Sequence, residues 1–121
     1  MHKSRLCAIG IDCQDADLEL AAEFWAKALG RPSKGVDGSY AGLEDRANQP
    51  IVFVQKVTHP SRVHLDIESD DVDAEVERLV ALGAKRVQQV ATWWVLEAPT
   101  GHRFCVVKPQ RGPLGDDASK W

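Results

Sequence analysis

The stretch "RVHLDIESDDVDAEVERLVALG" (residues 62–83) joins a strand pattern directly to a helix pattern. In its first half, His64, Asp66 and Glu68 alternate with apolar residues, and successive side chains of a strand point to opposite faces. In its second half, four apolar residues recur at helical spacing before Gly83, which can end a helix: Val72, Val76, Leu79 and Val80. The stretch therefore predicts a strand with one polar face, followed by an amphipathic helix.

The residues before this stretch show the same order of elements. "RLCAIGIDC" (5–13) has the composition of a strand, and "DLELAAEFWAKALG" (17–30) has one apolar helical face that ends at a glycine. The segment 31–50 is broken by glycine and proline into what we expect to be two brief strands. "IVFVQKV" (51–57) completes this half as a clear strand.

The residues after the stretch contain three short β-rich runs, at 85–90, 92–98 and 102–108. Both halves therefore read strand, helix, three strands. We expect an α+β fold with a single domain in residues 1–110, built from two βαβββ modules at about 5–57 and 62–108. Residues 111–121 combine proline, glycine and acids with little to bury, which predicts a flexible C-terminal tail.

Composition excludes several classes of partner. The chain has 121 residues, 44% of them hydrophobic, and a formal net charge of -3 with acids and bases spread along it. This pattern offers no basic stripe for nucleic acid and no polybasic or long apolar segment for a membrane. The sequence shows neither a membrane-span pattern nor a signal-peptide pattern, so we expect a cytoplasmic protein. The three cysteines form no C-x-x-C pair, so we expect reduced thiols.

Several motifs together resemble a known superfamily. The resemblance rests on the duplicated βαβββ order, on "FWAKALG" (24–30), on the stretch at 62–84 and on "APTGHRFCVV" (98–107). The chain resembles the glyoxalase/bleomycin-resistance/dioxygenase superfamily, also called the vicinal oxygen chelate superfamily, and most of all its small glyoxalase-like domains. The resemblance covers about residues 5–108. It implies two modules forming an open, curved, eight-stranded cup around a small molecule, often in a homodimer. In the enzymes of the superfamily a divalent metal in the cup chelates two vicinal oxygens of the substrate.

The metal ligands that the resemblance implies are mostly replaced in this chain. His64 occupies the ligand position that opens the second module, whereas Cys105 stands where a glutamate is usual. In the first module the corresponding positions are Gly10, or Ala8 with a shifted alignment, and Gln55. We therefore expect no divalent metal to copurify at a stoichiometric level. The alternative is zinc, nickel, manganese or iron bound through His64, because zinc also accepts a thiolate and Asp66 or Asp12 can complete its ligand shell.

The expected ligand-binding residues all lie on predicted strands. They are His64, Gln55, Asp66, Cys105 and Asp12, together with Trp93 and Trp94. The two tryptophans point to opposite faces of one strand, so one packs under a helix while the other can stack on a flat ligand. The sequence leaves open which tryptophan has which role, and it assigns no catalytic residue.

Three functions remain open at this point. The first hypothesis is a protein that binds a small aromatic or conjugated molecule in the cup, with an incomplete metal site. The second is a metal-dependent lyase, isomerase or dioxygenase of the vicinal oxygen chelate type. The third is a regulatory domain with a vestigial cup. For each we expect a homodimer, because an open cup leaves strand edges and apolar surface to be covered.

Overall fold

The computed structural model describes residues 1–121, and its elements occur in the order strand, helix, three strands, twice over. The elements are β1 (Lys3–Gln14), α1 (Leu18–Leu29), β2 (Ser33–Asp37), β3 (Tyr40–Leu43), β4 (Ile51–Val57), β5 (Arg62–Ser69), α2 (Val72–Ala81), β6 (Lys85–Val90), β7 (Trp93–Glu97), β8 (Arg103–Val107) and β9 (Ser119–Lys120). The predicted α+β class and the repeated βαβββ order are confirmed. Neither helix is long and apolar enough to cross a membrane.

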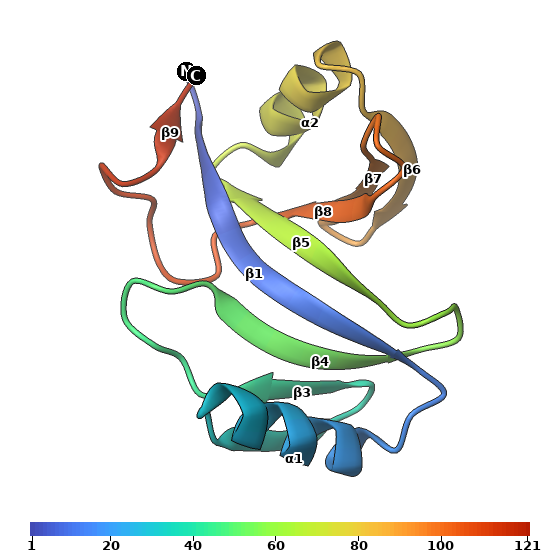
Figure 1. Ribbon diagram of the computed structural model, residues 1–121. Coiled ribbons are helices and arrows are strands. Elements are labelled where there is room, and N and C mark those ends of the chain that lie inside the picture. Colours follow the sequence, from blue (N-terminus) through green and yellow to red (C-terminus); the bar gives the residue numbers. More distant parts are fainter. The chain divides into compact units, whose positions relative to one another are not determined.

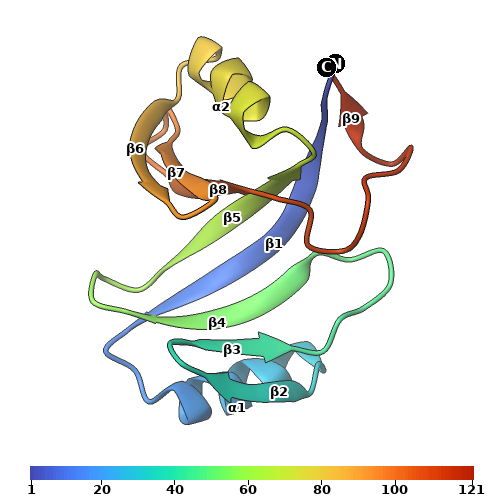
Figure 2. The same ribbon diagram turned by 180° about the vertical axis from the view of Figure 1, so that it is seen from behind.

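The chain forms two compact units, which divide β1 and β5 between them. The first unit is Ala8–His64, and the second unit is Met1–Cys7 together with Leu65–Trp121. In the first unit β1 runs parallel to β4, β3 is antiparallel to β4, and β2 is antiparallel to β3 (Figure 1). Helix α1 lies against β2, β3 and β4 (Figure 2).

The core of the first unit fills the space between α1 and its strands. Its buried residues are Leu18, Ala22, Ala41 and Val54 in one cluster and Ile11, Leu43 and Val52 in another. Because side chains alternate along a strand, the residues between these core positions point to the sheet face opposite α1. That face is therefore available for polar and aromatic side chains.

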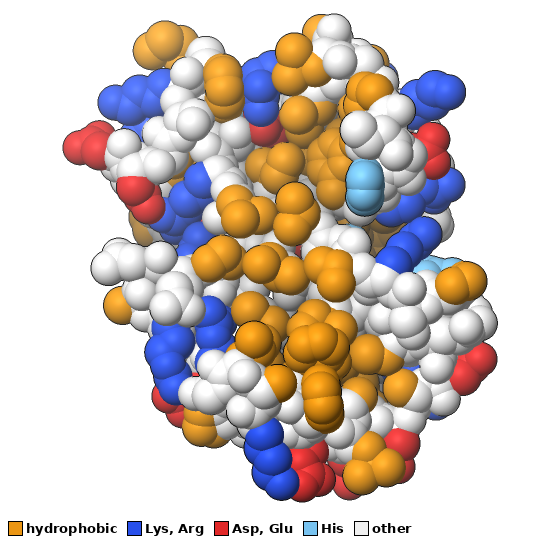
Figure 3. Space-filling model, viewed as in Figure 1, with side chains coloured by type: hydrophobic (Ala, Val, Ile, Leu, Met, Phe, Trp, Pro, Cys, Tyr) orange, Lys and Arg blue, Asp and Glu red, His pale blue; other side chains and the backbone are white.

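Helix α1 has well-defined ends and an exposed apolar side. The Asp17 carboxylate accepts hydrogen bonds from the backbone N–H groups of Glu19 and Leu20, and Gly30 ends the helix in the left-handed region at φ 68°. Leu20 and Phe24 are 65% and 62% exposed. Figure 3 shows the hydrophobic side chains gathered over this helix.

The second unit repeats the arrangement with its own helix. Strand β5 is parallel to β8, β7 is antiparallel to β8, and β6 is antiparallel to β7. The core beneath α2 is formed by Val76, Ala84, Leu96 and Val106. Helix α2 starts at Asp71, whose carboxylate accepts a hydrogen bond from the backbone N–H of Ala74.

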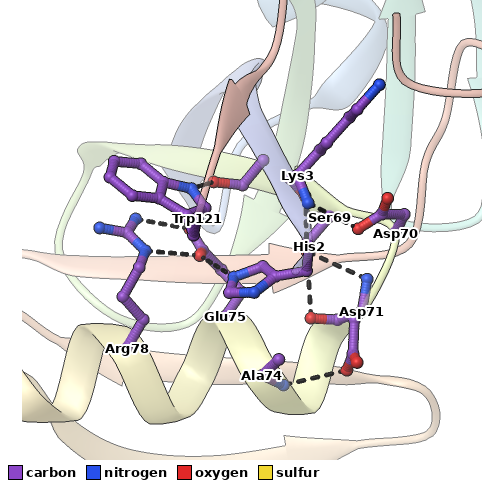
Figure 4. A network of polar contacts seen from close by, with 10 residues as sticks. His2, Lys3, Ser69, Asp70, Asp71, Ala74, Glu75, Arg78 and Trp121 are labelled. Atoms are coloured by element: carbon purple, nitrogen blue, oxygen red, sulfur yellow. Dashed lines mark hydrogen bonds and ion pairs between the residues drawn. The ribbon is translucent and has the colours of Figure 1, made fainter.

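The C-terminal segment has specific contacts in the second unit. Strand β9 is antiparallel to the first residues of β1. The indole Nε1 of Trp121 donates to Ser4 Oγ at 2.9 Å, and the Arg78 guanidinium lies 3.7 Å from the centroid of the Trp121 ring (Figure 4). Arg78 in turn donates two hydrogen bonds of 2.8 Å to Glu75, a fully buried carboxylate. The residues after β8 thus end in a short strand and in a tryptophan that contacts Ser4 and Arg78.

Glu68 is a second fully buried carboxylate. Its carboxylate accepts hydrogen bonds from Arg5 Nε at 2.7 Å, from Arg111 Nη2 at 3.0 Å and from the backbone N–H of Gln110 at 2.8 Å. Residues after β8 therefore cover this part of β5, and the contact spans 42 residues of sequence.

Candidate functional site

Strand β1 presents two different faces in the first unit. Ile11 and Cys13 belong to the side that packs with α1. Gly10 and Asp12 lie on the opposite side, next to their register partners Phe53 and Gln55 on β4. The alternation of the strand therefore places Asp12 on the sheet face that α1 leaves uncovered.

Asp12 and His64 form a close pair on this face. His64 Nδ1 lies 2.9 Å from Asp12 Oδ1 and 3.0 Å from Asp12 Oδ2, and the two side chains are 11% and 5% exposed. An ionised carboxylate only accepts hydrogen bonds, so Nδ1 is the donor and the ring orientation is fixed. A buried carboxylate that holds one ring nitrogen of a histidine is an arrangement that orients the imidazole for binding.

Aromatic rings continue the face beyond His64. The Phe53 and His64 rings meet edge to face with centroids 5.6 Å apart, and the Tyr40 and Phe53 rings are tilted with centroids 5.9 Å apart. The Gln55 amide donates to the Tyr40 hydroxyl at 3.3 Å. The face therefore combines flat apolar walls with amide and imidazole groups, as small-molecule sites do.

His59 is a residue that the sequence interpretation did not assign to the site. Its Nε2 lies 3.7 Å from Asp12 Oδ2, and its Nδ1 lies 2.8 Å from the carbonyl oxygen of Pro60. In the sequence, His59 is one residue before a proline in a loop, which is a common setting for a surface residue. Only the approach of this loop to β1 shows that a second imidazole lies near Asp12.

The second unit also has a sheet face opposite its helix. Asp66 on β5 is the register partner of Cys105 on β8, and Val95 on β7 is the partner of Cys105 on the other side. Trp93 is two residues before Val95 and shares its face, whereas Trp94 packs into the core beneath α2. Of the two tryptophans, Trp93 is therefore the one placed on the same face as Cys105 and Asp66.

The environments of the other two cysteines do not favour reactive thiolates. Burial, together with the nearby Glu68 carboxylate, raises the pKa of the Cys7 thiol to about 12. Burial also raises the pKa of Cys13, with a further contribution from the charge of Asp12. Both thiols are therefore protonated near neutral pH and act as small apolar side chains.

Comparison with known families identifies the fold. Residues 8–107 match the model of a family described as "Glyoxalase-like domain". The chain belongs to the glyoxalase-like family. No curated protein matches this glyoxalase-like domain.

Solved structures share the fold at low sequence identity. The Mn(II)-bound glyoxalase from Novosphingobium aromaticivorans is 18% identical with a TM-score of 0.64, and the match covers 96% of this chain but only 44% of that one. The hypothetical protein BH1468 from Bacillus halodurans is 9% identical with a TM-score of 0.68, covering 93% and 99% of the two chains. A glyoxalase/bleomycin resistance protein/dioxygenase superfamily member from Vibrio splendidus is 17% identical with a TM-score of 0.53, covering 85% and 98%. The expected superfamily is confirmed, and the likeness is one of fold.

The family implies a divalent metal, and the side chains of this glyoxalase-like domain fit one in a restricted way. In the first unit, His64 and Asp12 are possible ligands and lie in contact with each other. In the second unit, Asp66 on β5 is the register partner of Cys105 on β8. Imidazole, carboxylate and thiolate groups are all types of ligand that bind divalent ions. Gly10 offers no ligand atom, and the Asp12 contact holds Nδ1 of His64.

Proposed function

We propose that this glyoxalase-like domain binds a small aromatic or conjugated molecule on the sheet face opposite α1. The observation that carries the proposal is the row of Tyr40, Phe53 and His64 rings on that face, together with the Gln55 amide. Aromatic walls bury a flat ligand, and a few polar groups orient it. Asp12 supports the site by fixing the His64 ring.

We also propose that the second unit, taken by itself, contacts a ligand through Trp93, Asp66 and Cys105. Trp93 supplies a ring on the face opposite α2, and Asp66 and Cys105 supply polar groups beside it. Trp94, which packs beneath α2, is not part of this proposal.

A screen of phenols, aromatic acids and quinones is expected to yield compounds that change tryptophan fluorescence and raise the melting temperature. Binding to the folded state alone raises stability by mass action. For the best compound, Gln55→Ala should weaken the Kd about tenfold, which is the loss of roughly one good hydrogen bond. Gln55 is only partly buried, so its variant should keep the melting temperature of the unliganded protein.

The matched control is Gln89→Ala. Gln89 is also a strand glutamine, but its register partner is Trp94, on the helix side of its sheet. Its variant should bind as the wild type does. Equal affinity of both variants, or a screen without any stabilising compound, would argue against ligand binding at this face.

The second candidate function is a metal-dependent lyase, isomerase or dioxygenase. It is favoured by one observation, the pairing of the Asp66 carboxylate on β5 with the Cys105 thiol on β8. When bound, such a metal would polarise oxygens of the substrate. In the second unit Asp66 and Cys105 are the residues that would hold it, and in the first unit the candidate ligand is His64.

Elemental analysis decides between the two candidates. Protein purified without a metal-affinity tag should contain well below one equivalent of zinc, nickel, manganese or iron, because the usual ligands are absent at Gly10, Gln55 and Cys105. About one equivalent per chain, lost in Cys105→Ser but kept in the control Cys13→Ser, would instead favour the enzyme. Cys13 lies on the helix side of β1, so it tests for nonspecific thiol binding.

A further inference from the structure

Gly10 stands in the middle of a long strand, where glycine has a conformational cost. Its φ is not positive, so the backbone does not require glycine at this position. Glycine within a strand often marks a place where another group approaches closely. At Gly10 that group is a ring from β5.

The space where a side chain would begin at position 10 is already filled. A Cβ atom built on Gly10 would lie 2.3 Å from Cε1 and 2.6 Å from Nε2 of His64, and 2.7 Å from Cζ of Phe53. These distances are far below van der Waals contact, so the His64 ring and any side chain at position 10 exclude each other. Gly42 on β3 is a useful contrast, because its Cβ would meet only Lys34 Cδ at 3.5 Å, an ordinary contact.

The same ring position provides the contact with Asp12. Asp12 is two residues after Gly10 on the same face of β1, and its carboxylate holds His64 Nδ1 at 2.9 Å. We infer that Gly10 is a positioning residue, whose missing side chain places the His64 ring against β1 and on Asp12. This role rests on the proposed function and deepens it, because Gly10 would fix the position of the His64 ring on the proposed ligand-binding face. Any larger side chain at position 10 would need the volume that the His64 ring occupies, so Gly10 lets the ring lie directly over β1.

The test is a double-mutant cycle that needs no ligand. Gly10→Ala should lower the folding equilibrium constant about tenfold, as overpacking does, and should shift or remove the imidazole N–H signal of His64 in ¹H–¹⁵N spectra. The signal is assigned by its loss in His64→Ala. In the His64→Ala background, Gly10→Ala should cost less than twofold, because the ring is gone and the tip of Phe53 can move into its space. The control Gly42→Ala should leave the His64 signal unchanged in the wild-type background.

An equal cost of Gly10→Ala in both backgrounds, or an unchanged His64 signal, would overturn the inference while leaving ligand binding open. If Gly10→Ala alone does not fold, the Gly10→Ala/His64→Ala double variant decides. If the double variant folds, the positioning role is supported. If it does not fold, β1 requires glycine at position 10 independently of His64.

Discussion

Replacing Glu68 by alanine is expected to lower the free energy of unfolding by about 3 kcal/mol. Removal of one partner of a buried ion pair costs about 3–5 kcal/mol, and the lower end applies here because both arginine partners reach water. The Glu68 side chain is fully buried, while Arg5 and Arg111 are 19% and 28% exposed. Alanine would remove the acceptor that Glu68 provides to both guanidinium groups and to the backbone N–H of Gln110, whereas Arg5 keeps Asp117 and Arg111 keeps the Leu6 carbonyl oxygen.

Urea denaturation monitored by circular dichroism measures this cost. The matched control is Glu77→Ala, since Glu77 accepts a hydrogen bond from Arg86 at 2.7 Å but is 74% exposed. An exposed pair contributes at most about 1 kcal/mol, so the control should remain close to the wild type. Equal effects of the two substitutions would show that the burial of Glu68 is not what makes it important.

Acidification is expected to destabilise the second unit steeply through Glu75 and Glu68. Burial by itself would raise the pKa of each carboxyl group. Hydrogen bonds outweigh this effect, from Arg78 and His2 to Glu75 and from Gln110 and two arginines to Glu68. Both pKa values therefore lie below the ordinary range. A carboxylate with a lowered folded-state pKa stabilises the fold above its unfolded pKa of about 4.3. This stabilisation is lost as the pH falls through the lower folded-state pKa.

Urea unfolding at a series of pH values from neutral to below the unfolded carboxyl pKa tests this expectation. Glu75→Gln removes one titrating group, so its free energy of unfolding should start lower at neutral pH and fall less on acidification. Glu23→Gln is the control, because Glu23 makes an exposed ion pair with Lys27 that contributes little, so its loss should leave the pH profile nearly unchanged. A wild-type profile parallel to that of Glu75→Gln would contradict the expectation.

The fold was predictable because its signals are local. A β-rich composition marked residues 51–57 and 85–90 as strands, and the structure has β4 and β6 with these bounds. The two helices could be located because an apolar stripe, an aspartate at the start and a glycine near the end agree at each. Leu29, an apolar residue of the expected helix, is 47% exposed because it is the last residue of α1.

The candidate site was predictable only in part. Strand parity places Asp12 with Gly10, and Asp66 with His64, because parity needs no tertiary information. The contact between Asp12 and His64 spans 52 residues, and the loop that brings His59 to Asp12 has no periodic pattern. Parity also cannot say which face a helix covers, so the roles of Trp93 and Trp94 became distinct only in the structure.

Because the chain divides into two units, the fluorescence of its tryptophans can report on each unit separately. Trp25 is the one tryptophan among residues 8–64, where it packs against the core next to α1. The other three belong to the second unit, and Trp121 among them lies under a guanidinium. A variant that keeps only Trp25 would emit from the first unit alone, and a variant that lacks only Trp25 would emit from the second. Stopped-flow fluorescence of this pair can therefore time the unfolding of each unit separately within an intact chain.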